Sequence, residues 1–279
     1  MTLLFKLLSK LPLSWLHALG WMLGWLVFAA SGIYRRRFVA NAQQAGALRS
    51  DWLLAVGESG KLAAELPRLW LGRPATVLWD GAEHVDAALA RGSGVVFLTP
   101  HLGCFEITAQ AYAQRYGQTV QPMTVLFRPP RQAWLRAVVM ASRQRPGLLT
   151  APTTLSGVKQ LIKALKKGEA VGLLPDQVPP QGMGVMAPFF GRDAYTMTLS
   201  VRLVQQTGAT VLLAWGERLA WGRGYRVHVA PLDAPLPSDL TEAASAVNWA
   251  MQSLIMQCPS QYLWGYARYK QPRETAHTA

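Results

Sequence analysis

The chain has 279 residues, enough for one large domain or two small ones with a substantial buried core. Apolar residues make up 51% and charged residues only 15%, which excludes a disordered or collagen-like chain. Lysine and arginine number 28 against 15 acidic residues, so the formal net charge is +13 and an acidic partner is expected. The 11 tryptophans favour anionic lipid over nucleic acid as that partner.

Familiar nucleotide and hydrolase motifs are absent from the sequence. It contains neither a phosphate-binding loop nor the strained turn of serine hydrolases. Ser156 and Lys159 form a lone Ser-x-x-Lys without its companion motifs, and we interpret them as an ordinary first helical turn. The two cysteines, Cys104 and Cys258, fit neither a disulfide framework nor a metal-site spacing, which favours an intracellular chain or one independent of oxidation.

An uncharged stretch of 24 residues runs from Leu11 to Tyr34 and is followed by Arg35-Arg36-Arg37. A bilayer core takes about 20 helical residues, so the stretch is long enough to span. The arginines would keep the following chain on the cytoplasmic side. Two glycines and His17 lower its hydrophobicity, which leaves an interfacial helix as an alternative. A signal peptide cleaved near Ala29-Ala30-Ser31 is a third interpretation.

After helical residues 38–73, short apolar runs alternate with helical stretches. The expected strands are Val77 to Trp79, Val95 to Thr99, Met123 to Phe127, Ala170 to Leu174, Val211 to Trp215 and Tyr225 to Val229. The expected helices cover residues 104–116, 131–145, 155–167, 197–207 and 239–257. This alternation predicts an α/β fold, a mixed and largely parallel sheet covered by helices. No linker or repeat interrupts it, so we predict one catalytic domain, residues 38–279, after an N-terminal membrane segment, residues 1–37.

The segment Thr99-Pro100-His101-Leu102-Gly103-Cys104-Phe105-Glu106 follows the second expected strand. Chemistry in such sheets gathers at the carboxyl ends of the strands. Glu106 falls in the first turn of the next helix, where it can fold back and accept a hydrogen bond from one imidazole nitrogen of His101. That bond would fix the tautomer and leave the other nitrogen basic. The spacing therefore favours His101 as a general base oriented by Glu106, with a purely structural histidine as the alternative.

A histidine followed after four residues by an acid, on a membrane-attached α/β domain, resembles the glycerolipid acyltransferase superfamily. Glutamate at the acid position resembles the late acyltransferases of lipid A biosynthesis. The resemblance extends over residues 11 to 270 and includes further segments in chain order: Leu126-Phe127-Arg128-Pro129, Leu161-Ile162-Lys163-Ala164-Leu165-Lys166-Lys167-Gly168-Glu169, Leu174-Pro175-Asp176-Gln177, Pro188-Phe189-Phe190-Gly191 and Pro259-Ser260-Gln261-Tyr262-Leu263-Trp264.

The resemblance implies transfer of a fatty acyl chain from acyl carrier protein to a hydroxyl of a lipid A precursor at the bacterial inner membrane, on its cytoplasmic side. Arg143 and Asp176 match functional residues of the family by position. An arginine that polarises the thioester and one that binds substrate phosphate are both compatible with Arg143. A solvated helix face and a strand-end turn are the structural alternatives for Arg143 and Asp176. No constellation of residues suggests a metal or bound cofactor.

Other motif residues have weaker functional patterns. Arg128 follows an expected strand at the same sheet edge as His101, so it is a candidate phosphate or phosphopantetheine contact or simply a loop residue. Phe189-Phe190-Gly191 is expected to pack on the sheet or line an acyl groove. The segment Gln261 to Trp264 is interpreted as structural.

The sequence departs from the family pattern at positions that bear on which acceptor is used, not on the reaction. Tyr266 and Ala267 stand where a histidine and an arginine are usual, and only Arg268 is kept. A sibling acyltransferase acting on another glycolipid or a lysophospholipid is therefore a second candidate. A non-catalytic basic membrane-binding protein is a third, but it gives no reason for the His101 and Glu106 pair.

Cys104 lies inside the motif, where a helix N-terminus beside a histidine could lower the pKa of its thiol and make it a nucleophile. Direct attack by the acceptor hydroxyl needs no such covalent step, and we favour it. The remaining histidines lack a partnered acid in motif spacing and are interpreted as structural or exposed: His17, His84, His228 and His277.

Overall fold

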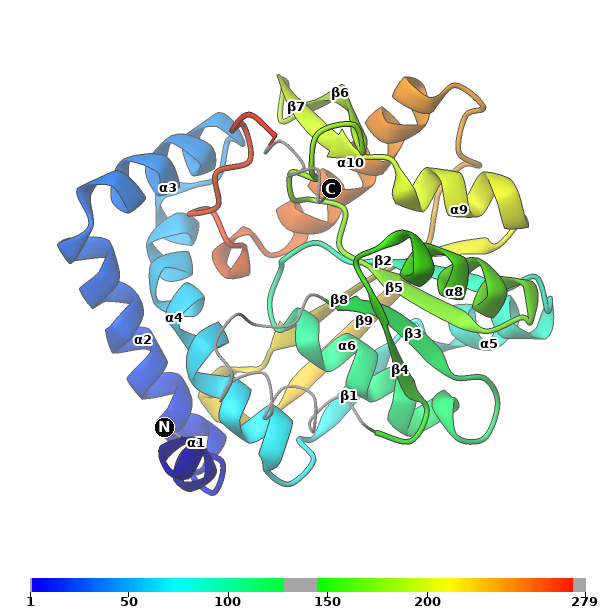
Figure 1. The fold of residues 1–279 in the computed structure, drawn as a ribbon. Helices are drawn as coiled ribbons and strands as arrows, with labels where there is room; N and C mark the ends of the chain where they lie inside the picture. Colours follow the sequence, from blue (N-terminus) through cyan, green and yellow to red (C-terminus); the bar gives the residue numbers. More distant parts are fainter. Residues whose placement is uncertain (1, 128–144, 273–279) are drawn as a thin grey trace, which may run out of the picture.

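A computed structural model describes residues 2–127 and 145–272 of the chain. Within these residues a seven-stranded sheet has the order β1-β9-β8-β2-β5-β3-β4 (Figure 1). Its strands are β1 (Val77–Asp80), β2 (Val95–Leu98), β3 (Met123–Phe127), β4 (Leu148–Pro152), β5 (Ala170–Leu173), β8 (Thr210–Arg218) and β9 (Tyr225–Pro231). Neighbouring strands pair in parallel except β8 and β9, which are antiparallel. The predicted mixed, largely parallel α/β sheet is confirmed.

The sheet is buried on both faces, which explains why its strands are nearly continuous apolar runs. In β2, Val96 and Leu98 belong to one core cluster, whereas Val95 and Phe97 belong to the other. Side chains on the first face meet α8 (Leu155–Lys166), α9 (Leu199–Thr207) and α10 (Leu240–Gln257); those on the second meet α5 (Ala82–Ala90) and α6 (Phe105–Tyr112). A hairpin of β6 (Gly184–Phe189) and β7 (Arg192–Met197) packs beside α10.

Four helices precede the sheet and form one side of the molecule (Figure 1): α1 (Thr2–Leu8), α2 (Leu13–Ala30), α3 (Gly32–Gln44) and α4 (Arg49–Leu71). Helices α2 and α4 cross closely at glycines. A Cβ atom at Gly60 would lie 2.0 Å from the carbonyl oxygen of Gly20, so this crossing excludes any larger residue. The apolar helix α2 is therefore packed closely against α4.

The outer face of α2 remains apolar and exposed, with Trp15, Met22 and Leu26 all at least 60% accessible. Among the described helices α2 has the length and hydropathy to cross a membrane, and 33% of it is buried. Helix α3 begins after Ser31 and runs unbroken through residue 37, with Arg35, Arg36 and Arg37 exposed. The predicted apolar segment is thus a helix of residues 13–30 with one free apolar face.

All six expected strands are present, while β4 and the β6–β7 hairpin were not expected from the sequence. The predicted helix 104–116 is α6, continued by a π-helical turn at Ala113–Gly117. The predicted helix 131–145 lies, apart from its last residue, outside the described residues.

Candidate active site at the carboxyl edge of the sheet

His101 lies in a tight turn directly after β2, at the carboxyl edge of the sheet. The turn is closed by a 2.7 Å hydrogen bond from the Leu102 amide to the Pro100 carbonyl. Gly103 follows with a φ of +57°, a backbone conformation that favours glycine. Its amide donates to the Gln261 carbonyl, and the Cys104 amide donates to the Gly216 carbonyl. The backbone on both sides of His101 is therefore fixed, while its side chain keeps 16% of its surface exposed.

Asp176 is the carboxylate that holds His101. It follows β5, the neighbour of β2, and its side chain is 1% exposed. One carboxylate oxygen lies 2.7 Å from His101 Nδ1, and the other accepts the His101 backbone N–H at 2.8 Å. The Tyr262 hydroxyl donates to that second oxygen at 3.2 Å. Since Nδ1–H donates to Asp176, Nε2 carries the free lone pair and is the basic nitrogen.

The charge state of Asp176 supports this arrangement. Burial alone would raise its pKa, but the electrostatic interaction with His101 and the hydrogen bonds from the His101 ring and backbone outweigh burial. The pKa of Asp176 is therefore held below its ordinary value, and the carboxylate is ionised at neutral pH. An ionised partner can stabilise the imidazolium that forms when His101 accepts a proton.

The expected hydrogen bond between His101 and Glu106 is not the one that the structure contains, and this part of the sequence interpretation is wrong. Glu106 lies in the first turn of α6, and its Oε2 accepts from Trp70 Nε1 at 3.4 Å. The parallel pairing of β2 with β5 brings Asp176, 75 residues away, to Nδ1 instead. Glu106 nevertheless lines the same cavity as His101.

His101 Nε2 faces the side-chain amide of Gln177, with 3.0 Å between the two nitrogens. Because Nε2 is the lone-pair nitrogen of this tautomer, the amide N–H of Gln177 donates to it. The Phe105 ring packs edge-on against the imidazole with centroids 4.8 Å apart.

A cavity of about 480 Å³ opens beside His101. Polar side chains in its lining include His101, Thr99 and Gln177 at the carboxyl edge of the sheet and Glu106 at the start of α6. Its walls are mostly apolar and include Phe97, Met123, Val125, Leu148 and Val227. A cavity of this size and lining can hold an apolar ligand, with His101 at its polar end.

Gly172 lies in the wall of the cavity, in the middle of β5 and in register with Phe97 and Val125. Here the sheet surface lacks a side chain. A Cβ atom at Gly172 would lie 3.1 Å from Val125 Cγ1 and 3.5 Å from the Met123 sulfur. Glycine at this position therefore keeps the middle of the cavity open.

The remaining candidates divide into those that the structure places and those that it does not. Arg128 and Arg143 lie outside the described residues. Tyr262, which sequence reasoning interpreted as structural, donates to Asp176 and so belongs to the site. Gln177 belongs to it as well; its place after Asp176 at a strand end was the available sequence signal. Among the described residues no group of three or more His, Cys, Asp or Glu side chains could hold a metal ion.

Cys104 is fully buried at the start of α6. Burial, reinforced by the negative charge of Glu65, raises the pKa of its thiol well above the ordinary value. A nucleophilic cysteine needs the opposite environment.

The variant Cys104→Ala is expected to retain at least about a third of the wild-type kcat, because the thiol is protonated and buried. Turnover measured well below the melting temperature checks this. Intact-mass analysis of wild-type protein incubated alone with the acyl donor that the sequence resemblance implies provides the control. An acyl adduct mapped to Cys104 would contradict the expectation and establish a covalent intermediate.

An α/β sheet with a buried Asp, a partly exposed His at a strand end and an apolar cavity beside them can carry out acid–base chemistry on an apolar ligand. Residues 62–271 match the family model of the bacterial lipid A biosynthesis acyltransferases. The match covers more than half of the chain, and the chain belongs to this family.

Individual relatives agree with the family. The chain is 28% identical over 192 residues to the lipid A biosynthesis palmitoleoyltransferase of Escherichia coli K12, covering 68% of this chain and 60% of that protein. It is also 28% identical over 198 residues to the lauroyltransferase of the same strain, with the same coverage of both chains. A phosphatidylinositol mannoside acyltransferase of Mycobacterium tuberculosis CDC 1551 is 30% identical over 149 residues, 51% of this chain and 45% of that protein. The matched region thus spans about three fifths of the length of the two lipid A enzymes.

Proposed function

We propose that this protein is an O-acyltransferase that moves a fatty acyl chain from an acyl carrier protein thioester to a hydroxyl of a lipid A precursor. The observation that carries the proposal is the His101–Asp176 pair at the edge of an apolar cavity. Membership of the lipid A acyltransferase family supports the choice of reaction.

The reaction follows from the two nitrogens of His101. Nε2 accepts the proton of the acceptor hydroxyl while that oxygen attacks the thioester carbonyl. Asp176, bonded to Nδ1, stabilises the resulting imidazolium. The tetrahedral intermediate collapses with cleavage of the carbon–sulfur bond, and the imidazolium returns its proton to the leaving thiolate. No metal or cofactor takes part in these steps.

Three further side chains belong to the proposal. Glu106, which lines the cavity beside His101, remains a proposed catalytic residue in a role other than orienting Nδ1. Arg143 and Arg128 are proposed to bind substrate phosphate or to stabilise the oxyanion, since developing negative charge needs positioned donors. The net charge of +13 is consistent with a thioester carrier and an acceptor that are both acidic.

The acyl chain is proposed to occupy the cavity. Phe127, level with the polar edge, and Met123, level with the amino ends of the strands, are four residues apart in β3. That separation corresponds to a depth of about 13 Å. Gly172 lies between these two levels, so the space over it is where a chain must pass to reach the deep end.

Substituting Gly172→Val is expected to shift acyl selectivity toward shorter chains, because the branched side chain fills the middle of the cavity. Relative kcat/KM for long over short chains should fall about 10-fold or more, the effect of one or two methylene groups in a tight pocket. Competition between carrier proteins loaded with different chain lengths measures it. Leu149→Val, an exposed change on β4 outside the described cavity lining, is the matched control. Unchanged selectivity in Gly172→Val would place the acyl chain elsewhere.

The family and the apolar helix α2 suggest membrane association. We propose an N-terminal membrane segment, residues 1–37, and a catalytic domain, residues 38–279, at the cytoplasmic side of the bacterial inner membrane. The exposed apolar face of α2 would contact lipid. Helix α8 lies on the far side of the molecule from α2 (Figure 1). Its exposed lysines 159, 163 and 166 offer an acidic carrier protein a surface away from the bilayer.

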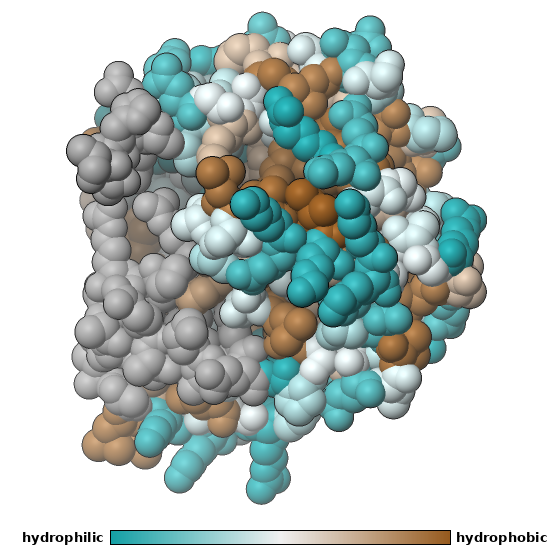
Figure 2. Space-filling view, turned by 45° about the vertical axis from the view of Figure 1, so that its right-hand side comes forward, coloured by the Kyte–Doolittle hydropathy of each residue, from teal (hydrophilic) through white to brown (hydrophobic). Residues whose placement is uncertain are grey.

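Figure 2 brings forward the right-hand side of Figure 1, where α8 and α9 lie, and the coloured part of this surface is largely hydrophilic with apolar patches between the hydrophilic side chains. This contrast with the apolar face of α2 supports one lipid-facing side and one solvent-facing side. Nucleic acid is not a proposed partner.

A second acceptor class deserves the same assay. The mycobacterial relative named phosphatidylinositol mannoside acyltransferase is 30% identical over its matched region, so a different glycolipid or a lysophospholipid is the alternative acceptor. A non-catalytic membrane-binding protein would have no use for a histidine held in one tautomer by a buried carboxylate.

The test is incubation of the protein with acyl carrier protein thioesters and a panel of acceptors: a lipid A precursor, a mannosylated glycolipid and a lysophospholipid. Mass spectrometry of the products identifies the acylated species. Acylated lipid A precursor is expected. Acylation of another acceptor alone would select the alternative, and no acylated lipid in any reaction would refute acyl transfer.

A further inference from the structure

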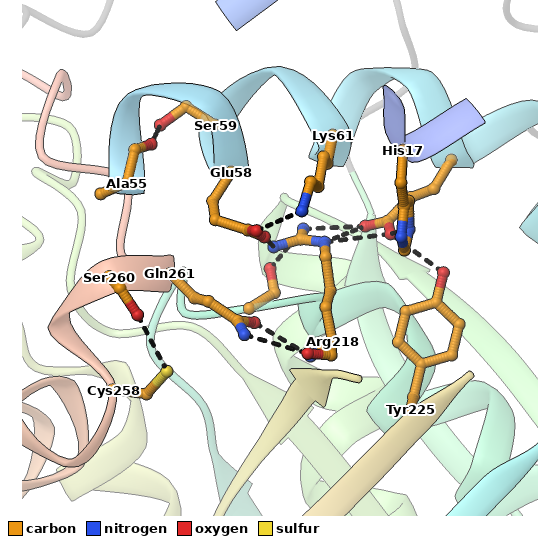
Figure 3. A network of polar contacts seen from close by, with 12 residues as sticks. His17, Ala55, Glu58, Ser59, Lys61, Arg218, Tyr225, Cys258, Ser260 and Gln261 are labelled. Atoms are coloured by element: carbon orange, nitrogen blue, oxygen red, sulfur yellow. Dashed lines mark hydrogen bonds and ion pairs between the residues drawn. The ribbon is translucent and has the colours of Figure 1, made fainter. Parts of the chain in front are cut away.

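A cluster of charged and polar groups, mostly buried, is shown in Figure 3; it contacts the turn that carries His101 through a hydrogen bond from Arg218 to the Gly103 carbonyl. We call it the Arg218 cluster; its members are His17, Glu58, Glu65, Arg218 and Tyr225. These residues come from α2, α4, β8 and β9. None of the five belongs to the described residues that line the cavity. The cluster therefore lies outside the reaction space described above.

The centre of the cluster is a two-pronged ion pair. Arg218 Nε lies 3.0 Å from both carboxylate oxygens of Glu65, and Nη2 lies 2.8 Å from Oε1. Tyr225 donates to Oε2 at 2.9 Å, and His17 Nε2 lies 3.1 Å from the same oxygen. Burial alone would raise the pKa of Glu65, but the Arg218 charge and the hydrogen bonds from His17 and Arg218 lower it to about 2. Glu65 is thus a permanent anion that orients Arg218.

Arg218 also holds the His101 turn. Its Nη2 donates to the Gly103 carbonyl at 2.7 Å, in a fully buried contact. The Gln261 side chain bonds both the backbone N–H and the backbone carbonyl of Arg218, at 2.9 and 3.1 Å. The Gln261 carbonyl accepts the Gly103 amide at 3.0 Å. Gly103 is therefore bound through both its amide and its carbonyl, two residues from His101.

We propose that Arg218 is a positioning residue for acyl transfer: held by Glu65, it fixes the Gly103 carbonyl and so sets where His101 Nε2 meets the acceptor hydroxyl. This proposal rests on the proposed function. A displacement of about 1 Å at a reacting group costs on the order of 100-fold in rate, so the hold on Gly103 is expected to affect kcat.

Stability alone does not require the ion pair. Replacing a buried ion pair by apolar residues of similar size is often neutral or stabilising, because the desolvation of both charges is avoided. The double variant Glu65→Leu/Arg218→Met therefore removes the Arg218 hydrogen bond to the Gly103 carbonyl while the fold is expected to be retained. Tyr225→Phe is the matched control, since it removes one contact to Glu65 and leaves the Arg218 to Gly103 bond intact.

The experiment measures kcat, KM for the acyl donor and melting temperature of wild type and variants in the acyl-transfer assay. The double variant should lose about 10- to 100-fold in kcat, with KM within about threefold and its fold retained. Tyr225→Phe should stay within about threefold of wild-type kcat. Wild-type kcat in a folded double variant would overturn the proposal. An inactive wild-type protein would instead refute the proposed function.

A second variant, Arg218→Lys, tests the proposal if the double variant does not fold. Arg218→Lys keeps the charge beside Glu65 but lacks the planar fork that binds Glu65 and Gly103 together. A folded Arg218→Lys protein with lowered kcat and unchanged KM supports the proposal, and one with wild-type kcat overturns it. Loss of fold in both variants would assign the pair to stability alone and would also overturn it.

Discussion

Replacing His101 by alanine is expected to lower kcat for acyl transfer by about 10³-fold, within the 10²- to 10⁴-fold range of general-base catalysis. The variant lacks the Nε2 lone pair that accepts the hydroxyl proton, and no other histidine is among the described residues that line the cavity. Because the backbone of the turn is fixed by Gln261, Gly216 and Arg218, the fold should survive the change.

The matched control for this prediction is His228→Ala. His228 is a partly exposed histidine that also bonds carboxylates, Asp80 and Glu217, each at 2.9 Å, but it lies outside the described cavity lining. Its kcat should stay within about threefold of wild type, the effect of losing surface contacts. Turnover by His101→Ala above a tenth of the wild-type rate would exclude His101 as the base.

The second large effect concerns Asp176. The isosteric variant Asp176→Asn is expected to lose about 10²- to 10⁴-fold in kcat, because an amide neither enforces the Nδ1–H tautomer nor stabilises the imidazolium. Glu106→Gln should also lose activity, since Glu106 lines the cavity and is proposed to be catalytic. Loss of activity alone therefore does not identify which carboxylate orients His101.

Proton NMR of the imidazole distinguishes the two carboxylates. The Nδ1–H resonance of His101 should be strongly shifted in wild type and in Glu106→Gln, because its hydrogen bond to Asp176 is intact. It should lose that shift in Asp176→Asn. The reverse pattern would restore the pairing of His101 with Glu106 that the sequence spacing favoured.

The location of the site could be predicted from the sequence, but the partner of His101 could not. An apolar run ending at Pro100, with a polar motif after it, already puts His101 at the carboxyl edge of a sheet. Glu106 is close in sequence, yet α6 carries it toward Trp70. Asp176 becomes the partner because β5 pairs with β2, and strand order is a property of the assembled sheet that local patterns do not contain.

The strands also divide into those that local sequence patterns predict and those that they do not. Those predicted are apolar runs between clear breaks, and they are all present. Strand β4 was missed because Leu148–Pro152 mixes buried and exposed residues without regular alternation, lies at the edge of the sheet and includes a proline. The hairpin β6–β7 was missed for a related reason, since it stands apart from the main sheet and Pro188 interrupts its pattern.

The interpretation of helix α2 differs most between the sequence and the structure. Its composition favoured a membrane segment separate from the catalytic domain. In the structure α2 crosses α4 at glycines and places His17 beside Glu65, so it also forms part of the support behind the His101 turn. Composition shows that this helix is apolar, but it does not show that His17 on the same helix is buried against Glu65 inside the domain.

The central claim, that His101 and Asp176 act as one unit in acyl transfer, is tested most directly by a double-mutant cycle of kcat/KM. Wild type, His101→Ala, Asp176→Asn and the double variant are assayed with the same acyl carrier protein thioester and lipid acceptor. If Asp176 acts through His101, the double variant should be no slower than His101→Ala within about threefold. Multiplication of the two single losses in the double variant would contradict the claim.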